Sequence, residues 1–391
     1  MIGIHTHRLS AQESIENLIS RNVFDGYENI RILPKGKTLI FSCENNVFRN
    51  KVEGLKTVLN NLSHCGYDTL QIVTLISDLP MIQTIFKSQA SLQIIKGQTD
   101  SIAGNTHLQI SYKTDNTWKI LQRIKPVNSH LNKFDLIFYP QVSVMNVLLS
   151  RIYEVQINIA PALEVSLWRG MNFTGQVILP LANHYVFGQE GDLIRAGIIT
   201  VAQEFRLPGT ILGRAVLGKF NSDRYGSDFS LTRYFIKGKA YLKVNGGFTG
   251  IYEYHDREWF RNDLKTLTCF LKGGFYYSPV NVQLDGSAGR YLNGDYGLRG
   301  DITRYWGETA IGFFAMLGSG KLNGGFHFTI PIGTRQFKKN RIFQMRAPSY
   351  FAWEYNAGTD FHYGQIYKTR PDENRVEQFY NPNLIIKNLL K

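Results

Sequence analysis

A long alternation of side-chain character restricts this chain more than any other feature of its sequence. Residues 239–251 read KAYLKVNGGFTGI, in which every even-numbered position from Ala240 to Gly250 is apolar or small. Lysine, asparagine and threonine fall on the other parity. Strands of soluble sheets run for about 5 or 6 residues, whereas a tilted strand that crosses a bilayer needs about 9 to 11. The run is therefore long enough to form a membrane-crossing strand.

The same pattern recurs from residue 155 to residue 357. A hairpin is expected from two alternating runs at 155–167 and 173–181, which the turn RGMN separates. Short turns separate most of the later runs and no crossover helix intervenes, so consecutive strands are expected to pair as an antiparallel up-and-down sheet. With this hairpin, about 12 strands are expected. The others lie at 194–207, 211–220, 226–235, 239–252, 264–277, 280–292, 297–306, 309–318, 321–332 and 349–357.

Each of these runs has one aliphatic or aromatic face and one face of glycine, hydroxyl, amide and charged residues. A soluble β-sandwich would also alternate, but the strand length and the charges that share one parity favour a transmembrane β-barrel with a polar lumen. The residues expected to face lipid are Leu242, Val244, Phe248, Val282, Phe326 and Phe328. The lumen-facing candidates are Glu164, Glu204, Arg214, Asp228, Lys243, Asp285, Arg299, Asp301, His327 and Glu354.

Charges of opposite sign in a narrow lumen are expected to pair. Two interpretations stay open, a packed ionic plug that fills the barrel and a charged lining that selects a permeant. Asp285 is near enough in sequence to Arg299 and Asp301 for one of them to be its cross-strand neighbour. His327 could act as a general base, but no nucleophile motif or acid partner accompanies it at a known spacing, so a hydrogen-bonded filling role is expected.

The chain before residue 131 has a different texture. Residues 1–130 are expected to form a separate mixed α/β domain, because helical periodicity alternates there with short β-rich runs. A capping-box spacing begins one expected helix at Ser10, and an apolar stripe from Val52 to Leu62 marks a second. Strands are expected at 29–33, 38–43, 70–76 and 108–112. The remaining divisions are 131–152 as a connection or extra strand, 153–368 as the barrel, and 369–391 as a C-terminal tail.

Three longer connections, near 182–193, 253–263 and 333–348, interrupt the short turns. Long loops of outer-membrane barrels normally face the cell exterior and tight turns face the periplasm. A barrel that begins at residue 153 after a periplasmic domain would place these connections on the wrong side. An additional strand within 134–148 would restore the usual sidedness, so about 14 strands are also allowed.

The formal net charge of +13 is spread along the chain without one dense basic run, which indicates anionic lipid headgroups or an acidic polymer as partners, and no nucleic acid. No run of 18 apolar residues is present, so no transmembrane helix is expected. The three cysteines have no metal-binding spacing. No catalytic residue, metal site or cofactor is expected. Residues 1–14 lack a basic segment followed by an apolar one, so no leader is visible in this chain.

Five stretches of the sequence resemble the YjbH-like outer-membrane proteins. They are ENNVFRNKVEGL (44–55), SLWRGMNFTGQVILPL (166–181), EFRLPGTILGRAVLGKFNSDRYG (204–226), RYLNGDYGLRGDITRYWGETAIGFF (290–314) and NGGFHFTIPI (323–332). That family is associated with bacterial exopolysaccharide production. The resemblance implies a non-enzymatic barrel of the bacterial outer membrane that assists secretion or surface assembly of an exopolysaccharide. Its partners would be outer-membrane lipid, an acidic polysaccharide and periplasmic export proteins.

Two other functions remain as alternatives at this point. An outer-membrane enzyme acting on lipid or glycan would need a constellation of histidine, serine or carboxylates, for which only His327 and the loop residues His255, Asp256 and Glu258 are candidates. A soluble β-rich binding module would have the same alternation with its polar face in water.

Overall fold

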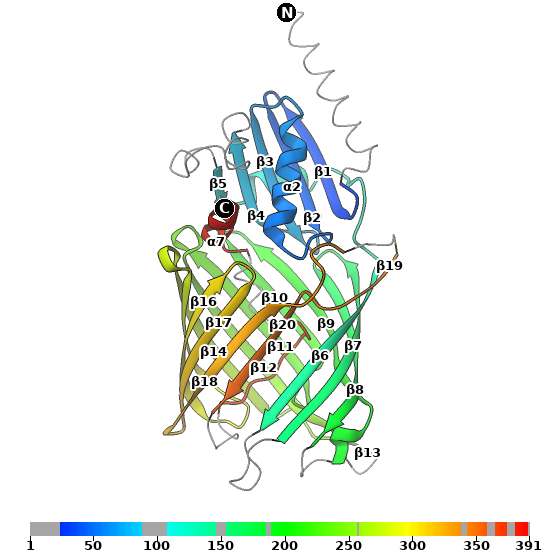
Figure 1. Ribbon diagram of the computed structural model, residues 1–391, viewed down its shortest axis with the longest axis vertical. Helices are drawn as coiled ribbons and strands as arrows, with labels where there is room; N and C mark the ends of the chain where they lie inside the picture. The colour runs from blue at the N-terminus through cyan, green and yellow to red at the C-terminus, as the bar shows by residue number, and fades with distance from the viewer. Residues whose placement is uncertain are drawn as a thin grey trace, which may run out of the picture.

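The computed structural model describes residues 24–87, 108–145, 154–184, 189–255, 258–337, 342–357, 364–373 and 380–389, and the account below concerns these residues. They form a mostly β protein with two sheets. A small five-stranded sheet lies above one end of a large fifteen-stranded sheet (Figure 1). The helix expected near Ser10 lies outside the described residues.

The small N-terminal sheet has the strand order β1-β2-β3-β4-β5. Strands β2 and β3 are parallel, and helix α2 (Lys51–Ser63) makes the crossover that a parallel pair requires. Asn50 begins this helix, because its side chain accepts a hydrogen bond of 2.9 Å from the Val52 amide. The four strands and this helix expected from the sequence are confirmed. The strands are β1 (Tyr27–Lys35), β2 (Thr38–Asn45), β3 (Thr69–Ile76), β4 (Leu79–Lys87) and β5 (Leu108–Ser111).

Helix α5 (Asp115–Leu121) covers the other face of the small sheet, where Trp118 and Leu121 pack against Ile40, Val73 and Leu75. Neither this helix nor strand β4 was expected from the sequence. α5 has only seven residues, too few for a helical period to stand out.

All twelve strands expected after residue 153 are present, and of the two possibilities left open for 131–152, a connection or an extra strand, the strand is observed as β6. The strands follow the order β19-β6-β7-β8-β9-β10-β11-β12-β14-β15-β16-β17-β18-β20, with β13 pairing β12 off this path. The bounds are β6 (Phe134–Met145), β7 (Glu154–Trp168), β8 (Met171–Asn183), β9 (Arg195–Leu207), β10 (Ile211–Lys219), β11 (Arg224–Phe235), β12 (Ala240–His255), β13 (Glu258–Arg261), β14 (Thr266–Tyr277), β15 (Val282–Arg290), β16 (Tyr296–Trp306), β17 (Thr309–Gly318), β18 (Lys321–Pro331), β19 (Phe343–Arg346) and β20 (Tyr350–Asn356).

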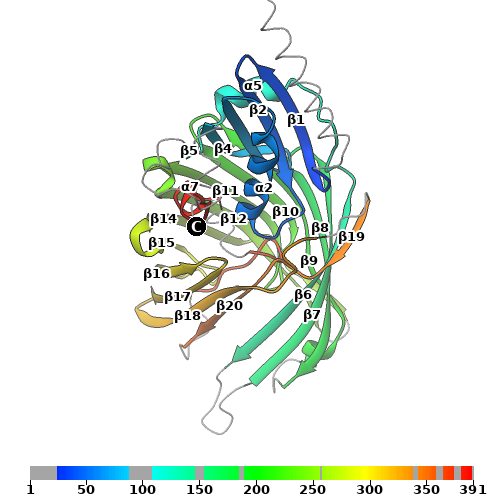
Figure 2. The ribbon, with the colours of Figure 1, turned by 45° about the horizontal axis from the view of Figure 1, so that its top comes forward.

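The large sheet curves around an interior, and its two ends approach each other (Figures 1 and 2). The Trp353 indole of β20 donates a hydrogen bond of 3.0 Å to the Val142 carbonyl of β6. No backbone ladder joins these two strands over the described residues, so the expected closed barrel is not observed there. The path holds fourteen strands, and without β19 thirteen remain, so β6 and β20 run in the same direction. The edge of β6 is already paired over its first four residues, because the short parallel strand β19 lies there.

Five short turns of the large sheet, after β7, β9, β11, β14 and β16, lie at the end that meets the small sheet, here called the domain end. The Gly170 amide donates to the Ser77 carbonyl at 2.8 Å, and Arg206 beside the next turn donates to the Pro80 carbonyl at 2.7 Å. Since β6 is a strand, the connections near 182–193 and 253–263 lie at the opposite end, here called the far end (Figure 1). The connection near 333–348 lies at the domain end, where the Phe337 amide donates to the Val47 carbonyl at 2.7 Å.

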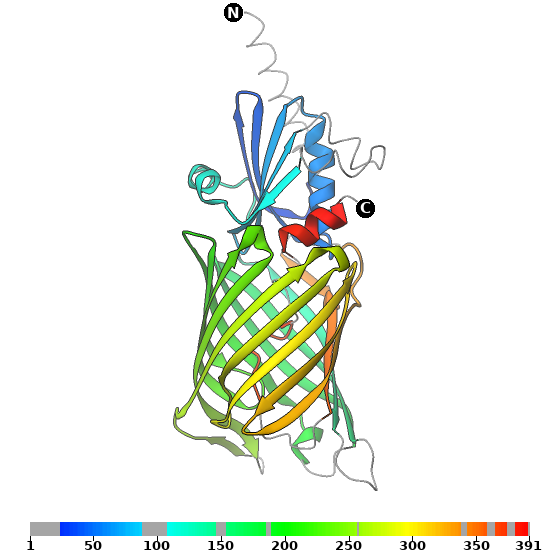
Figure 3. The same cartoon turned by 90° about the vertical axis from the view of Figure 1, so that its left-hand side faces the viewer.

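The C-terminal residues return to the small sheet. Helix α7 (Pro382–Leu389) lies between the small sheet and the rim of the large sheet (Figure 3). Ile385 and Leu389 belong to the same buried cluster as Leu55 and Leu59 of α2. Tyr234 of β11 belongs to this cluster as well. A fragment that ended at residue 130 would therefore lack part of the core that covers its own sheet.

The described helices include none that is both long and apolar enough to cross a membrane.

Candidate functional site

On the large sheet the apolar face is exposed and the polar face is buried, which is the reverse of the distribution in a soluble protein. On β16, Leu298 and Ile302 are each 58% exposed, whereas Asp301 is 7% exposed and Thr303 is 0% exposed. The exposed apolar residues define the outer face and the buried polar residues define the inner face. Other exposed apolar residues of the wall strands are Leu217, Phe229, Leu267, Leu271, Leu284, Ile311, Phe313, Leu317 and Leu322.

Four of the six residues expected to face lipid are exposed on the outer face, namely Leu242, Val244, Phe248 and Phe326. Val282 and Phe328 are half-buried. The alternation along each strand produces this division, because successive side chains of a strand point to opposite faces.

Arg299 lies at the centre of an ionic cluster on the inner face. Its guanidinium binds Asp301 of the same strand through two hydrogen bonds of 3.0 and 2.9 Å. It binds Glu354 of β20 through two more, of 2.8 and 2.7 Å. The Phe314 ring lies under the guanidinium, 3.9 Å from Cζ to the ring centroid. Arg299 and Asp301 of β16 and Glu354 of β20, three of the predicted lumen residues, therefore form one cluster, here called the Arg299 cluster.

His327 borders the Arg299 cluster and is buried. Its Nε2 atom is 3.6 Å from the Asp301 Oδ1 atom and 3.5 Å from the Thr303 Oγ1 atom. A nucleophile, base and acid relay needs the hydroxyl on one ring nitrogen and the carboxylate on the other. Here both groups approach the same nitrogen, so these three side chains are not arranged as a catalytic relay.

Asp285 lies directly opposite Asp301 in the β15–β16 ladder, and Arg299 lies opposite Ser287. Of the two cross-strand neighbours considered for Asp285, Asp301 is the observed one. The Asp285 carboxylate accepts hydrogen bonds from the Tyr241 hydroxyl at 2.6 Å and from the Gln283 amide at 2.9 Å. These donors stabilise a carboxylate that faces another carboxylate across the ladder.

A second polar group of the inner face includes residues from the end of the chain. Arg214 approaches Glu204 at 3.7 Å, and Arg370 approaches the same Glu204 oxygen at 3.6 Å. Asp228 accepts hydrogen bonds from Asn245 at 3.0 Å and from the Tyr367 hydroxyl at 2.8 Å. Residues 364–373, here called the C-terminal segment, therefore lie inside the curved sheet.

The C-terminal segment is the part of this site that sequence reasoning missed. Tyr367, Thr369 and Arg370 belong to a polar stretch without period, and it resembles a solvent-exposed tail. The one available signal was Tyr367, an aromatic residue among charged neighbours.

The remaining two candidates are placed as follows. Glu164 accepts a hydrogen bond of 2.8 Å from the Tyr139 hydroxyl. Lys243 is half-buried and lies opposite Thr232 on one neighbouring strand and Lys272 on the other. All ten candidates thus have a described position, and together they border the interior at several heights and do not meet at one reaction centre.

A salt bridge joins the small sheet to the large one. Arg49 binds Glu308, in the turn after β16, through hydrogen bonds of 3.0 and 2.8 Å, and the Tyr350 hydroxyl donates to Glu308 at 2.9 Å. Burial by itself raises the pKa of Glu308, but the hydrogen bonds from Arg49 and Tyr350 bring that pKa below its ordinary value. The hydrogen bonds that Arg49 donates to Glu308 in turn raise the pKa of Arg49.

Acid is expected to weaken this contact. Because the pKa of Glu308 in the folded chain is below its ordinary 4.5, its stabilising contribution is complete above pH 4.5 and is lost as the pH falls through the lowered pKa. The contribution should be about 2 kcal/mol, which is typical of hydrogen bonds to a charged group. Glu308→Gln should lose it at every pH. The unfolding temperatures of the wild type and of Glu308→Gln, measured between about pH 3 and about pH 7, should differ at neutral pH and converge in acid. A difference that stays constant across this pH range would contradict the assignment.

Among the described residues, a metal site and a cysteine nucleophile would be two further kinds of chemistry. Within the described ranges, no group of three or more histidine, cysteine, aspartate or glutamate side chains is arranged to hold a metal ion. Burial, with the nearby Glu44 charge, raises the pKa of the Cys43 thiol, which therefore does not supply a thiolate nucleophile.

Comparison of the chain with protein-family models, curated proteins and solved structures finds no match.

Proposed function

We propose that this chain is a β-barrel protein of the bacterial outer membrane, in which the large sheet spans the bilayer and its interior is filled. The single observation that carries the proposal is the inverted burial of the large sheet. Monomeric soluble proteins rarely expose large contiguous apolar patches, whereas lipid-facing strands alternate apolar-out and polar-in. Exposed apolar residues on nine or more neighbouring strands form such a band.

Strand length and the position of aromatic residues support the same proposal. The wall strand β12 has 16 residues and β7 has 15, beyond the roughly 9 to 11 that a tilted crossing strand needs. Trp168, Tyr277 and Trp306 are exposed at the strand ends of the domain end. Tryptophan and tyrosine are enriched where a membrane protein meets the headgroups.

Closure of the sheet in the membrane is part of the proposal. In hydrocarbon each unpaired backbone group costs several kcal/mol, so lipid favours pairing of β6 with β20 beside the Trp353–Val142 hydrogen bond. Tight turns face the periplasm in outer-membrane barrels. Five short turns lie at the domain end, and the longer connections after β8 and β12 lie at the far end, so the small sheet is assigned to the periplasm.

The filled interior supports a docking role. The Arg299 cluster and the C-terminal segment place paired charges inside the curved sheet, and these side chains narrow the path that a polymer would have to take. The resemblance of five sequence stretches to YjbH-like proteins supports assistance in exopolysaccharide secretion or surface assembly. Periplasmic export proteins would bind the small sheet, and the net charge of +13 suits an acidic polysaccharide or anionic headgroups.

Heat-modifiable mobility tests the membrane assignment. The purified chain should require detergent and should migrate faster in unheated than in boiled samples during electrophoresis, because a folded barrel stays compact in detergent. A sample unfolded in urea before loading is the control and should migrate as the boiled form does. A monomer that stays in solution without detergent would refute the proposal and favour the soluble β-rich module.

A further inference from the structure

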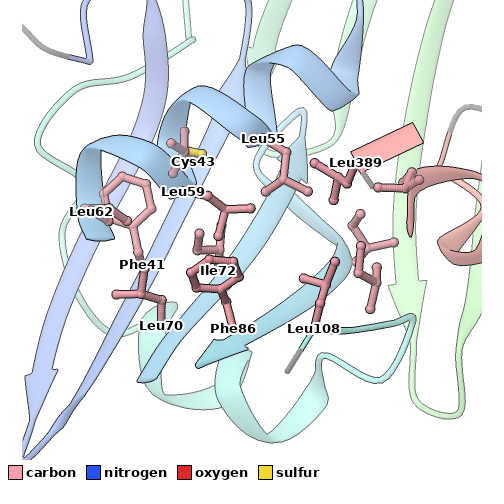
Figure 4. Close-up of a cluster of buried hydrophobic side chains, with 14 of the residues drawn as sticks. Phe41, Cys43, Leu55, Leu59, Leu62, Leu70, Ile72, Phe86, Leu108 and Leu389 are labelled. Atoms are coloured by element: carbon pink, nitrogen blue, oxygen red, sulfur yellow. The ribbon is translucent and has the colours of Figure 1, made fainter. Parts of the chain in front are cut away.

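Helix α7 is anchored by apolar contacts on two sides. Ile385 and Leu389 are buried in the core of the small sheet, where Leu389 lies beside Leu55 and Leu108 (Figure 4). Leu384 packs on the other side against Tyr276, Tyr305 and Ala310 of the large sheet. The helix therefore fills the space between α2 and β5 on one side and the strand ends of the large sheet on the other.

Polar contacts fix the orientation of α7 at the rim of the large sheet. The Lys387 ammonium donates to the carbonyls of Ser278 and Pro279 at 2.9 and 3.1 Å. The Asn381 and Asn383 amides donate to the carbonyls of Gly238 and Lys237 at 2.9 and 3.2 Å. Two tight turns of the domain end thus act as acceptors for this helix.

The C-terminal segment, which precedes α7, is held differently. At the far end the Gly364 amide donates to Asp295 at 2.8 Å. Further along, Tyr367 stacks on Phe220 with ring centroids 5.0 Å apart, and Arg370 approaches Glu204. These contacts are mostly polar, and water can replace polar contacts when a polar interior opens. Water cannot replace the apolar contacts of the buried α7 side chains in this way. The anchoring of α7 therefore decides whether the C-terminal segment stays inside.

We propose that the surface formed by α2, β5 and the turns at 236–238 and 278–280 is a binding site for an amphipathic helix, which the chain's own α7 occupies here. A partner helix that replaces α7 releases the C-terminal segment from the interior. This inference rests on the proposed function and adds its regulation: a periplasmic partner that binds the small sheet opens the filled interior.

The chemistry of α7 specifies the partner. Ile385 and Leu389 are four residues apart and share one helical face toward the small sheet. Lys387 supplies a cation for the carbonyls of the turn at 278–280. The partner is therefore a protein with a short amphipathic helix that carries an aliphatic pair at this spacing and a lysine or arginine beside it.

Two measurements on the full chain test the site. The probe is a fluorescent peptide with the sequence of residues 380–391, YNPNLIIKNLLK, and its affinity is measured in detergent by anisotropy. An intramolecular helix competes at a high effective concentration, so Leu389→Asp, which weakens α7, should bind the peptide at least about tenfold more tightly than the wild type. In planar bilayers the wild type should conduct little, and Leu389→Asp should conduct as much as a chain lacking residues 364–391.

Lys387→Ala keeps the apolar anchor and removes only the contacts to the turn carbonyls, so it provides a second, milder variant should Leu389→Asp not fold. It should shift both readouts in the same direction as Leu389→Asp, and Asn388→Ala on the same helix should shift neither. Wild-type affinity and conductance in both folded variants would overturn the inference. Failure of every form to insert into bilayers would count against the membrane assignment alone, because the peptide affinities in detergent still decide whether the helix site exists.

Discussion

Replacement of Val244 by arginine is expected to destabilise the protein in lipid by about 2 to 4 kcal/mol, the cost of a cation near the bilayer midplane on the outside of a barrel. Val244 lies near the middle of β12 and is 49% exposed on the outer face. Urea titrations of the chain folded into phospholipid vesicles would measure the change in the free energy of unfolding. The loss should be largest for a bilayer whose midplane coincides with this residue.

Lys243→Arg is the matched control for this prediction. It places an arginine one residue away on the inner face, where a cation is already present, and it should change the stability in vesicles much less. If the outer face met water, Val244→Arg would add a charge to a solvated surface and would change stability by about 0.5 kcal/mol or less. Equal stabilities of Val244→Arg and wild type in vesicles would therefore exclude the lipid-facing assignment of β12.

Asp301→Ala is expected to cost about 3 kcal/mol, which is the lower end of the range for removing one partner of a buried ion pair. Asp301 is 8% exposed in its side chain, and its carboxylate accepts two hydrogen bonds from Arg299. The substitution leaves the Arg299 guanidinium with Glu354 as its remaining carboxylate partner in the Arg299 cluster. The value is placed at the lower end because Glu354 still neutralises part of the charge.

Asp263→Ala is the control for the second prediction. Asp263 and its partner Lys265 have side chains that are 82% and 76% exposed, and such surface pairs contribute about 0 to 1 kcal/mol. The urea midpoint should therefore fall for Asp301→Ala and stay near the wild-type value for Asp263→Ala. Similar small shifts for both variants would mean that the Arg299 cluster is not a packed, desolvated lattice, and the interpretation as an open charged lining would gain support.

The sequence by itself determined which residues form the wall and which face each residue occupies. Strand β12 illustrates the reason: apolar and polar residues alternate along it, and successive side chains of any strand point to opposite faces. Parity is therefore a local property that can be read without knowing the neighbours of the strand. Four of the five strands of the small sheet were predictable on the same local grounds, through the apolar stripe of α2 and the β-rich runs beside it, whereas β4 was not.

Only the tertiary structure decided the register, the ends of the sheet and the contents of the interior. That Asp285 faces Asp301 depends on the lengths of the turn and of both strands, which parity does not specify. Whether β6 and β20 form a ladder depends on how two strands more than two hundred residues apart are brought together, and on β19, which pairs the first residues of β6. The C-terminal segment and α7 are held by side-chain contacts with strands distant in sequence, such as Arg370 with Glu204 and Leu384 with Tyr276. Such contacts have no period along the chain, so they exist only once the large sheet has curved and brought its inner face together.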